Sequence, residues 1–211
     1  MRNSLTEFIG TFFLVLTIGL TVLGGTPLAP LAIGASLMIM VYMGGHISGG
    51  HYNPAVTLAV ALRGKLAAKE VLPYMLAQVA GALAAALVTR LVMGRTFAPA
   101  PSDQASTLAV LLVELLYTFA LCLVVLNAAT SSKTQGNSFY GLAIGFTIVV
   151  AAFAGGPISG GAFNPAVGIG PTVVDAVLAG GSYQHLWLYL VGPLLGGAMA
   201  AGVFRVQERE A

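Results

Sequence analysis

Six long apolar stretches, separated by short segments that hold most of the polar and charged residues, dominate the pattern of this chain. A helix needs about 20 mostly apolar residues to cross the hydrocarbon core of a bilayer. We therefore expect six transmembrane helices, of which the second and the fifth are short. The predicted spans cover residues 5–23, 31–45, 72–93, 108–127, 140–154 and 186–206.

The composition indicates a membrane protein rather than a water-soluble domain. Hydrophobic residues make up 57% of the chain and charged residues only 8%, whereas about a quarter of the residues of a soluble domain are charged. A signal peptide is the alternative interpretation of the first apolar stretch. Glu7 interrupts that stretch and no small-residue cleavage site follows it, so we expect it to remain as the first span.

The basic residues predict the orientation in the membrane, because cytoplasmic loops carry an excess of lysine and arginine. An inside N-terminus places seven basic residues in the cytoplasm and two outside. We expect a multi-pass protein of the cell membrane with both termini in the cytoplasm. The basic residues are scattered over loops and form no stripe, which argues against a nucleic-acid partner. The cytoplasmic set is Arg2, Arg63, Lys65, Lys69, Lys133, Arg205 and Arg209, and the outer set is Arg90 and Arg95.

The second half of the chain repeats the first. Residues 32–56 and 143–167 match at 13 of 25 positions, and both contain Ile-Ser-Gly-Gly followed by Asn-Pro-Ala-Val. Glu7 and Glu114 occupy related positions in the first and fourth spans. Three spans per half is an odd number, so the second half enters the membrane from the opposite side. The predicted single domain covers residues 1–211, and its inverted repeats cover about 1–96 and 107–206.

Each Asn-Pro-Ala motif predicts the start of a helix. Asn is a favoured N-cap, and Pro is favoured at the first helical position, where its missing N–H is not needed. A helix from Pro54 to Leu62 has nine residues and is about 14 Å long, half of the hydrocarbon thickness. We therefore expect two re-entrant half-helices that meet N-terminus to N-terminus. Gly168, Gly170 and Pro171 predict less regular first turns in the second of them.

The segments before the two motifs are predicted to be irregular and to line a pore. Irregular backbone at membrane depth is tolerated only where it is buried in protein or lines a water-filled cavity. The carbonyl groups of these segments are natural acceptors for a file of small hydrogen-bonding molecules. The residues concerned are Gly49, Gly50, His51, Tyr52, Gly160, Gly161, Ala162 and Phe163.

Paired Asn-Pro-Ala motifs, each preceded by Ser-Gly-Gly and placed after the second and fifth spans, resemble those of the aquaporin, or major intrinsic protein, family. The resemblance covers essentially the whole chain. It implies an all-α membrane protein with six transmembrane helices, two re-entrant half-helices and one pore in each subunit of a homotetramer. It also implies a passive channel for water and other small neutral solutes, with no enzymatic activity and no cofactor.

The resemblance assigns the centre of the pore to the two motifs. Asn53 and Asn164 are expected to donate side-chain N–H groups to the permeant molecule. Each helix N-terminus carries roughly half a positive charge, so two of them that face one point disfavour a cation, including a hydronium ion. The predicted central constriction consists of Asn53, Pro54, Ala55, Asn164, Pro165 and Ala166.

A second constriction on the outer side, the selectivity filter, is where the chain departs from the family pattern. Counting from the asparagines places the filter at Ile33, Ala152, Gly161 and Val167. Val167 replaces the arginine that usually follows the second motif. An arginine there donates hydrogen bonds, fills volume and repels cations, and valine does none of these. We expect a wider, apolar mouth that passes water and neutral solutes such as ammonia, urea, hydrogen peroxide or dissolved gases.

Glu7 and Glu114 lie well inside predicted spans, where a carboxylate is functional by default. One interpretation is ion coupling in a secondary transporter, which saturable, gradient-driven uptake would favour. The other is that each carboxylate accepts hydrogen bonds from loop N–H groups around the re-entrant segments, as the resemblance implies. We favour this structural role, because the two residues are related by the repeat and have no evident titratable partner.

The histidines predict no metal site. His46 and His51 have no Cys, Asp or Glu near them in the sequence. We expect His46 to fasten the loop before the first motif and His51 to contribute its backbone carbonyl. His185 is expected to lie in an aromatic belt at the membrane surface with Trp187 and Tyr189.

The single cysteine, Cys122, excludes an intrachain disulfide bond. Its place in the middle of the fourth span predicts a packing residue rather than a reactive thiol. No combination of nucleophile, base and orienting group is evident in the chain, so a membrane enzyme is a weak alternative. A purely structural membrane protein is a further alternative, which the absence of any flux would reveal.

Overall fold

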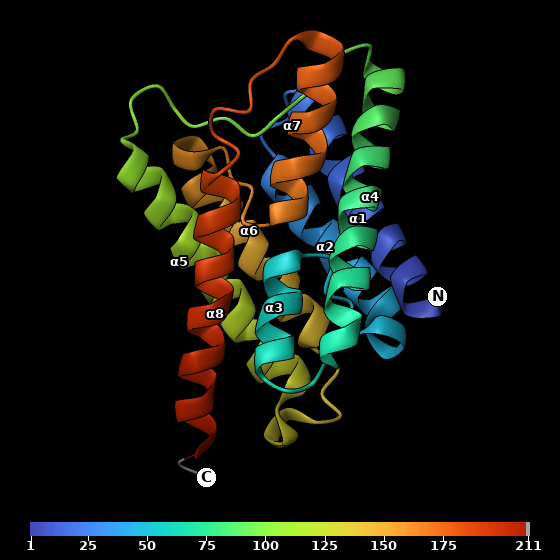
Figure 1. Cartoon of the computed structure of the whole chain (residues 1–211), viewed down its shortest axis with the longest axis vertical. Helices are drawn as coiled ribbons and strands as arrows, with labels where there is room; N and C mark the ends of the chain where they lie inside the picture. Colours follow the sequence, from blue (N-terminus) through green and yellow to red (C-terminus); the bar gives the residue numbers. More distant parts are fainter. Residues whose placement is uncertain (210–211) are drawn as a thin grey trace.

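The computed structural model describes residues 1–209, and every regular element among them is helical. Six helices are long and apolar enough to cross a membrane, as predicted, and two shorter ones lie between them (Figure 1). The helices are α1 (Arg2–Leu23), α2 (Ala29–Ser48), α3 (Pro54–Leu62), α4 (Ala68–Met93), α5 (Thr107–Val125), α6 (Tyr140–Ser159), α7 (Pro165–Ala179) and α8 (Leu188–Arg209), with a π-helical turn, η1 (Leu126–Thr130), and a 3-10 turn, η2 (Ser132–Thr134), between α5 and α6.

Helices α2 and α6 are longer than the sequence predicted. They continue for three and five residues beyond the expected ends at 45 and 154. Gly155, in the added part of α6, shows why: a Cβ atom at this residue would come within 2.8 Å of the Val113 side chain. Close packing at the glycine thus outweighs its low helix propensity. The two helices end at Gly49 and Gly160, which adopt the left-handed conformation common at helix C-termini.

The prediction that α7 would be irregular in its first turns is wrong. The helix is continuous over 15 residues, about 22 Å, so it is longer than the nine-residue α3. Gly168 lies against Tyr189, and Gly170 lies against Ala82; a Cβ atom at either glycine would come within 2.7 and 2.6 Å of these neighbours. The glycines allow close contact with α8 and α4, and this packing stabilises the helix despite their low propensity.

The helices pack in the same pairs in both halves of the chain. Helix α1 packs along α4, and α5 packs along α8, while α2 and α6 join the halves. Gly81 brings α4 close to the carbonyl of Phe8, and Gly196 brings α8 close to the carbonyl of Leu115; a Cβ atom at either glycine would overlap that oxygen. Each short helix packs on a long helix of the other half, α3 on α8 and α7 on α4.

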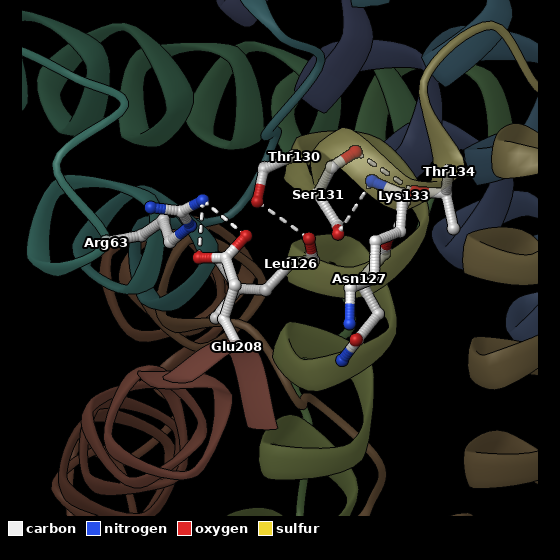
Figure 2. Close-up of polar contacts among 8 residues, drawn as sticks. All are labelled: Arg63, Leu126, Asn127, Thr130, Ser131, Lys133, Thr134 and Glu208. Atoms are coloured by element: carbon white, nitrogen blue, oxygen red, sulfur yellow. Dashed lines mark hydrogen bonds and ion pairs between the residues drawn. The ribbon is translucent and has the colours of Figure 1, made fainter. Parts of the chain in front are cut away.

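Polar contacts fix the end of the molecule that contains the C-terminus (Figure 2). Arg63, which follows α3, pairs with Glu208 of α8 at 2.8 Å, and its guanidinium lies 4.8 Å from the centre of the Phe204 ring. The side-chain amide of Asn127 in η1 donates to Oε1 of Gln207 at 3.2 Å. The C-terminal end of α3 is thus attached to α8, while the N-terminal end of α3 lies in the centre of the fold.

Candidate functional site

The two Asn-Pro-Ala motifs meet in the centre of the molecule. The side-chain oxygen of Asn53 caps α3 by accepting from the N–H of Ala55 at 2.8 Å, and Asn164 caps α7 in the same way through Ala166 at 2.9 Å. The side-chain amide of each asparagine reaches the other half. Asn53 Nδ2 donates to the carbonyl of Phe163 at 2.9 Å, and Asn164 Nδ2 donates to the carbonyl of Tyr52 at 2.9 Å.

Each asparagine has one side-chain N–H group left over after these contacts. A side-chain amide has two N–H groups, and within residues 1–209 only one of them on each asparagine has a partner. Both asparagines are buried to within 4% exposure, yet both line a cavity of about 280 Å³. The N-termini of α3 and α7 lie beside the asparagines. This part of the cavity therefore favours a hydrogen-bond acceptor and disfavours a cation.

Tyr52 and Phe163 precede the two motifs, and their unusual backbone conformation lets α3 and α7 begin at the centre. Both have a positive φ, +50° and +49°, a left-handed conformation that costs a residue with a side chain roughly 1–2 kcal/mol. Hydrogen bonds on both sides of each residue stabilise it. The N–H of Tyr52 donates to Glu7 Oε2 at 2.6 Å, and its carbonyl accepts from Asn164. The same arrangement holds Phe163, through Glu114 and Asn53.

Glu7 collects the donors of the first irregular segment. Its carboxylate is fully buried and accepts from Ser48 Oγ at 2.6 Å, from the N–H of His51 at 3.0 Å and from the N–H of Tyr52. A fourth donor is Gln78 Nε2 at 2.8 Å. Hydrogen bonds from several donors are what a buried carboxylate requires, and here they also fix the segment that precedes α3.

Glu114 does the same for the second segment with one donor fewer. It is also fully buried and accepts from Ser159 Oγ at 2.7 Å, from the N–H of Ala162 at 3.0 Å and from the N–H of Phe163 at 2.6 Å. The two carboxylates therefore occupy related places in the two halves. Neither lines the cavity that contains the asparagines.

Gln78 is a site residue that sequence reasoning missed. It is fully buried in α4, and its amide also donates to Thr57 Oγ1 at 2.9 Å. Thr57 in turn lies 3.2 Å from Nδ1 of His51. A polar amide in the middle of an apolar span was the available signal, because such residues are expensive in lipid and face the protein interior.

Replacing Gln78 with leucine should destabilise the folded protein in detergent by about 1–3 kcal/mol, because buried Glu7 and Thr57 lose a shared donor. Thermal unfolding of the purified protein measures the change. Gln184→Leu, at an exposed loop residue, is the matched control and should unfold close to the natural chain. Equal unfolding temperatures for both variants would contradict the assigned role.

Two buried tyrosines complete the support of the irregular segments. Tyr74 donates its hydroxyl to the carbonyl of Ser48 at 2.9 Å, and Tyr189 donates to the carbonyl of Ser159 at 2.6 Å. The prediction that Tyr189 belongs to a surface aromatic belt is therefore wrong, since its side chain is fully buried. Trp187, at 46% exposure, is at the surface as expected.

The cavity that the asparagines line is also lined by all four predicted filter residues, Ile33, Ala152, Gly161 and Val167. The rest of its wall is mainly aliphatic. Seven of the eight residues predicted to offer carbonyls line this cavity, and Gly49 lines a different one. The carbonyls of Tyr52 and Phe163 already accept from the asparagines. The aliphatic lining comes from Leu14, Ile18, Val22, Leu37, Val56, Leu121, Val125, Ile144 and Ile148.

A second, more polar cavity of about 930 Å³ lies toward the end that contains the C-terminus. Arg63, Lys65, Glu70 and His46 line it, together with residues of η1 and η2, and His51 lines both cavities. The prediction that His46 fastens a loop is wrong, because this residue is exposed in the last turn of α2. The reason is that α2 continues for three residues beyond its expected end at 45, which places His46 inside the helix.

Within the part of the chain that the structure describes, no group of three His, Cys, Asp or Glu side chains could hold a metal ion. Cys122 is fully buried in α5, where it packs in the main apolar cluster.

Six spanning helices, with two shorter helices that meet at paired asparagines beside an internal cavity, define a multi-pass helical channel protein. The family model described as "Major intrinsic protein" matches residues 1–204. The chain therefore belongs to the major intrinsic protein family, the aquaporin family, and is a channel rather than an enzyme.

Individual relatives extend over most of the chain. It is 38% identical to "Aquaporin NIP1-4" of Oryza sativa subsp. japonica, over 97% of this chain and 76% of that protein. It is 36% identical to "Glycerol uptake facilitator protein-like 6" of Lactiplantibacillus plantarum, over 100% of both chains. The X-ray structure of the aquaglyceroporin from Plasmodium falciparum has a TM-score of 0.86 over 96% of this chain and 94% of that one; at 21% identity it bears on the fold alone.

Proposed function

We propose that the chain is a passive channel for water and other small neutral solutes, and that it excludes protons at the paired asparagines. The observation that carries the proposal is the cavity that joins the asparagines to Ile33, Ala152, Gly161 and Val167. A pair of donors and an uncharged filter along one cavity suit a molecule that accepts hydrogen bonds and has no net charge.

Proton exclusion rests on the asparagines in this proposal. A central water molecule must accept from Asn53 and Asn164, so both of its hydrogens point away from the centre and no continuous proton wire crosses it. The two half-helix N-termini add an electrostatic barrier to a hydronium ion. The filter contributes little to this barrier, because Val167 carries no charge.

The second candidate is a channel mainly for ammonia, urea, hydrogen peroxide or dissolved gases. The side chains at positions 33, 152, 161 and 167 offer neither a charge nor a hydrogen-bonding group, which favours solutes less polar than water. A relative named as a glycerol uptake facilitator supports a pore that admits solutes larger than water. Relative permeabilities distinguish the two candidates.

The proposal places both termini in the cytoplasm of a cell-membrane protein, with the polar cavity at the cytoplasmic mouth. Arg63 and Lys65 at that mouth support this orientation, because basic residues concentrate on the cytoplasmic side. We further propose that the protein is a homotetramer with one pore per subunit, and that residues 1–96 and 107–206 form its inverted repeats. Cross-linking in native membranes tests the subunit number.

Proteoliposomes that contain the chain should shrink faster after an osmotic step than empty liposomes, as light scattering measures. A pH gradient across the same membranes should decay no faster than in empty liposomes. Ala152→Trp, which places a bulky ring in the proposed filter, is the blocked control. Water flux equal to that of empty liposomes would overturn the channel, and saturable uptake driven by an ion gradient would point to a secondary transporter.

A further inference from the structure

The connection between α4 and α5 crosses the end of the molecule opposite the C-terminus (Figure 1). Two hydrogen bonds attach this connection to α7 and to α6. Thr96 Oγ1 donates to Asp175 Oδ1 of α7 at 2.5 Å, and the N–H of Ser102 donates to the carbonyl of Ile158 at 3.0 Å. We call residues 96–102 the outer strap. It is attached at both ends, so it cannot swing freely.

Phe97 anchors the first part of the outer strap in the protein interior. Its ring occupies a notch beside Gly19 of α1, where a Cβ atom on the glycine would come within 2.5 Å of the ring and 2.6 Å of Thr89 Oγ1. The ring also packs against the apolar cluster that contains Val167 and Ala162. Phe97 does not line the cavity itself, whereas Ala162 and Val167 of that cluster do.

Ala100 brings the second part of the outer strap onto the irregular segment that precedes α7. Its backbone lies directly on Gly160, where an added Cβ atom would be 2.5 Å from the Ala100 carbonyl oxygen and 2.6 Å from its nitrogen. Gly160 and Gly161 both line the cavity. Pro99 and Pro101, on either side of Ala100, restrict the backbone because each fixes its own φ. The outer strap is therefore stiff where it meets the filter.

We infer that the outer strap sets the width of the filter and that Phe97 is a specificity-determining residue, which acts by positioning Val167. The valine side chain is short, so the position of its methyl groups depends on what packs behind them. Phe97 supplies that support through the cluster it shares with Val167, while Ala100 holds the backbone of Gly160. This inference rests on the proposed function, because it concerns the selectivity of the same pore.

Phe97→Ala in the full chain should raise the ratio of urea to water permeability by about threefold or more in proteoliposomes, because the unsupported Val167 can move back from the pore. A residue that only stabilised the fold would lower both fluxes together and leave the ratio unchanged. Phe97→Leu should restore most of the natural ratio. Phe153→Ala, at a half-exposed phenylalanine of α6, is the matched control.

Thr96→Val, which removes the hydrogen bond to Asp175, should raise the same ratio in the same direction and serves as the test if Phe97→Ala does not fold. An unchanged or lowered ratio in a folded variant would overturn the inference while leaving the channel itself in place. A natural chain that conducts no water would instead refute the proposed function. The two failures are thus separate.

Discussion

A chain in which arginine replaces Val167 should conduct urea and glycerol about tenfold less than the natural chain, while its water permeability falls much less. Val167 lines the cavity of about 280 Å³ together with the three other residues of the proposed filter. If these residues form the constriction, an arginine adds volume and donors there, so larger solutes lose more room than water does. A tenfold difference corresponds to about 1.4 kcal/mol in the barrier to permeation.

Stopped-flow light scattering on proteoliposomes measures all three permeabilities in one preparation. Val167→Leu is the control for volume without charge, and it should reduce urea and glycerol flux less than the arginine variant. Unchanged urea and glycerol flux through a folded Val167→Arg channel would mean that residue 167 does not lie at the narrowest place.

Removing the carboxylate of Glu114 should destabilise the protein more than removing the amide of Gln78. In Glu114→Ala the N–H groups of Ala162 and Phe163 lose their buried acceptor, and each unsatisfied donor costs about 1–3 kcal/mol. The second irregular segment then loses the contacts that hold Phe163 in its left-handed conformation. We expect a total loss of about 3–5 kcal/mol, enough to lower the unfolding temperature by about 10 °C.

Thermal unfolding and size-exclusion chromatography in detergent measure this loss. The control is Glu208→Gln, because its partly exposed ion pair with Arg63 contributes only about 0.2–1 kcal/mol. If Glu114→Ala is as stable as the natural chain but no longer conducts, the carboxylate acts in transport, as the ion-coupling interpretation requires.

The sequence predicted the six spans and the starts of α3 and α7, because each of these depends on local signals. About twenty apolar residues predict a span in any context, and Asn-Pro is a favourable helix start at Asn53 and Asn164 alike. The repeat added the information that the two starts belong together. That they exchange hydrogen bonds with Tyr52 and Phe163 depends on packing between the halves, which no local pattern contains.

The glycines account for most of what the sequence failed to predict. Gly155, Gly168 and Gly170 read as helix breakers by propensity, but in the structure they admit Val113, Tyr189 and Ala82 into close contact with intact helices. The outer strap could not be predicted either, because its contacts join residues far apart in the chain, such as Thr96 and Asp175.

The exchanged hydrogen bonds at the centre also have a consequence for biogenesis. Asn53 enters the membrane during synthesis long before Phe163, its carbonyl partner, has been made. The proposed barrier against protons would therefore form last, when the second half docks on the first. Until then α3 has no opposing helix, so a truncated chain that ends before residue 163 lacks the partner of Asn53 and should not exclude protons.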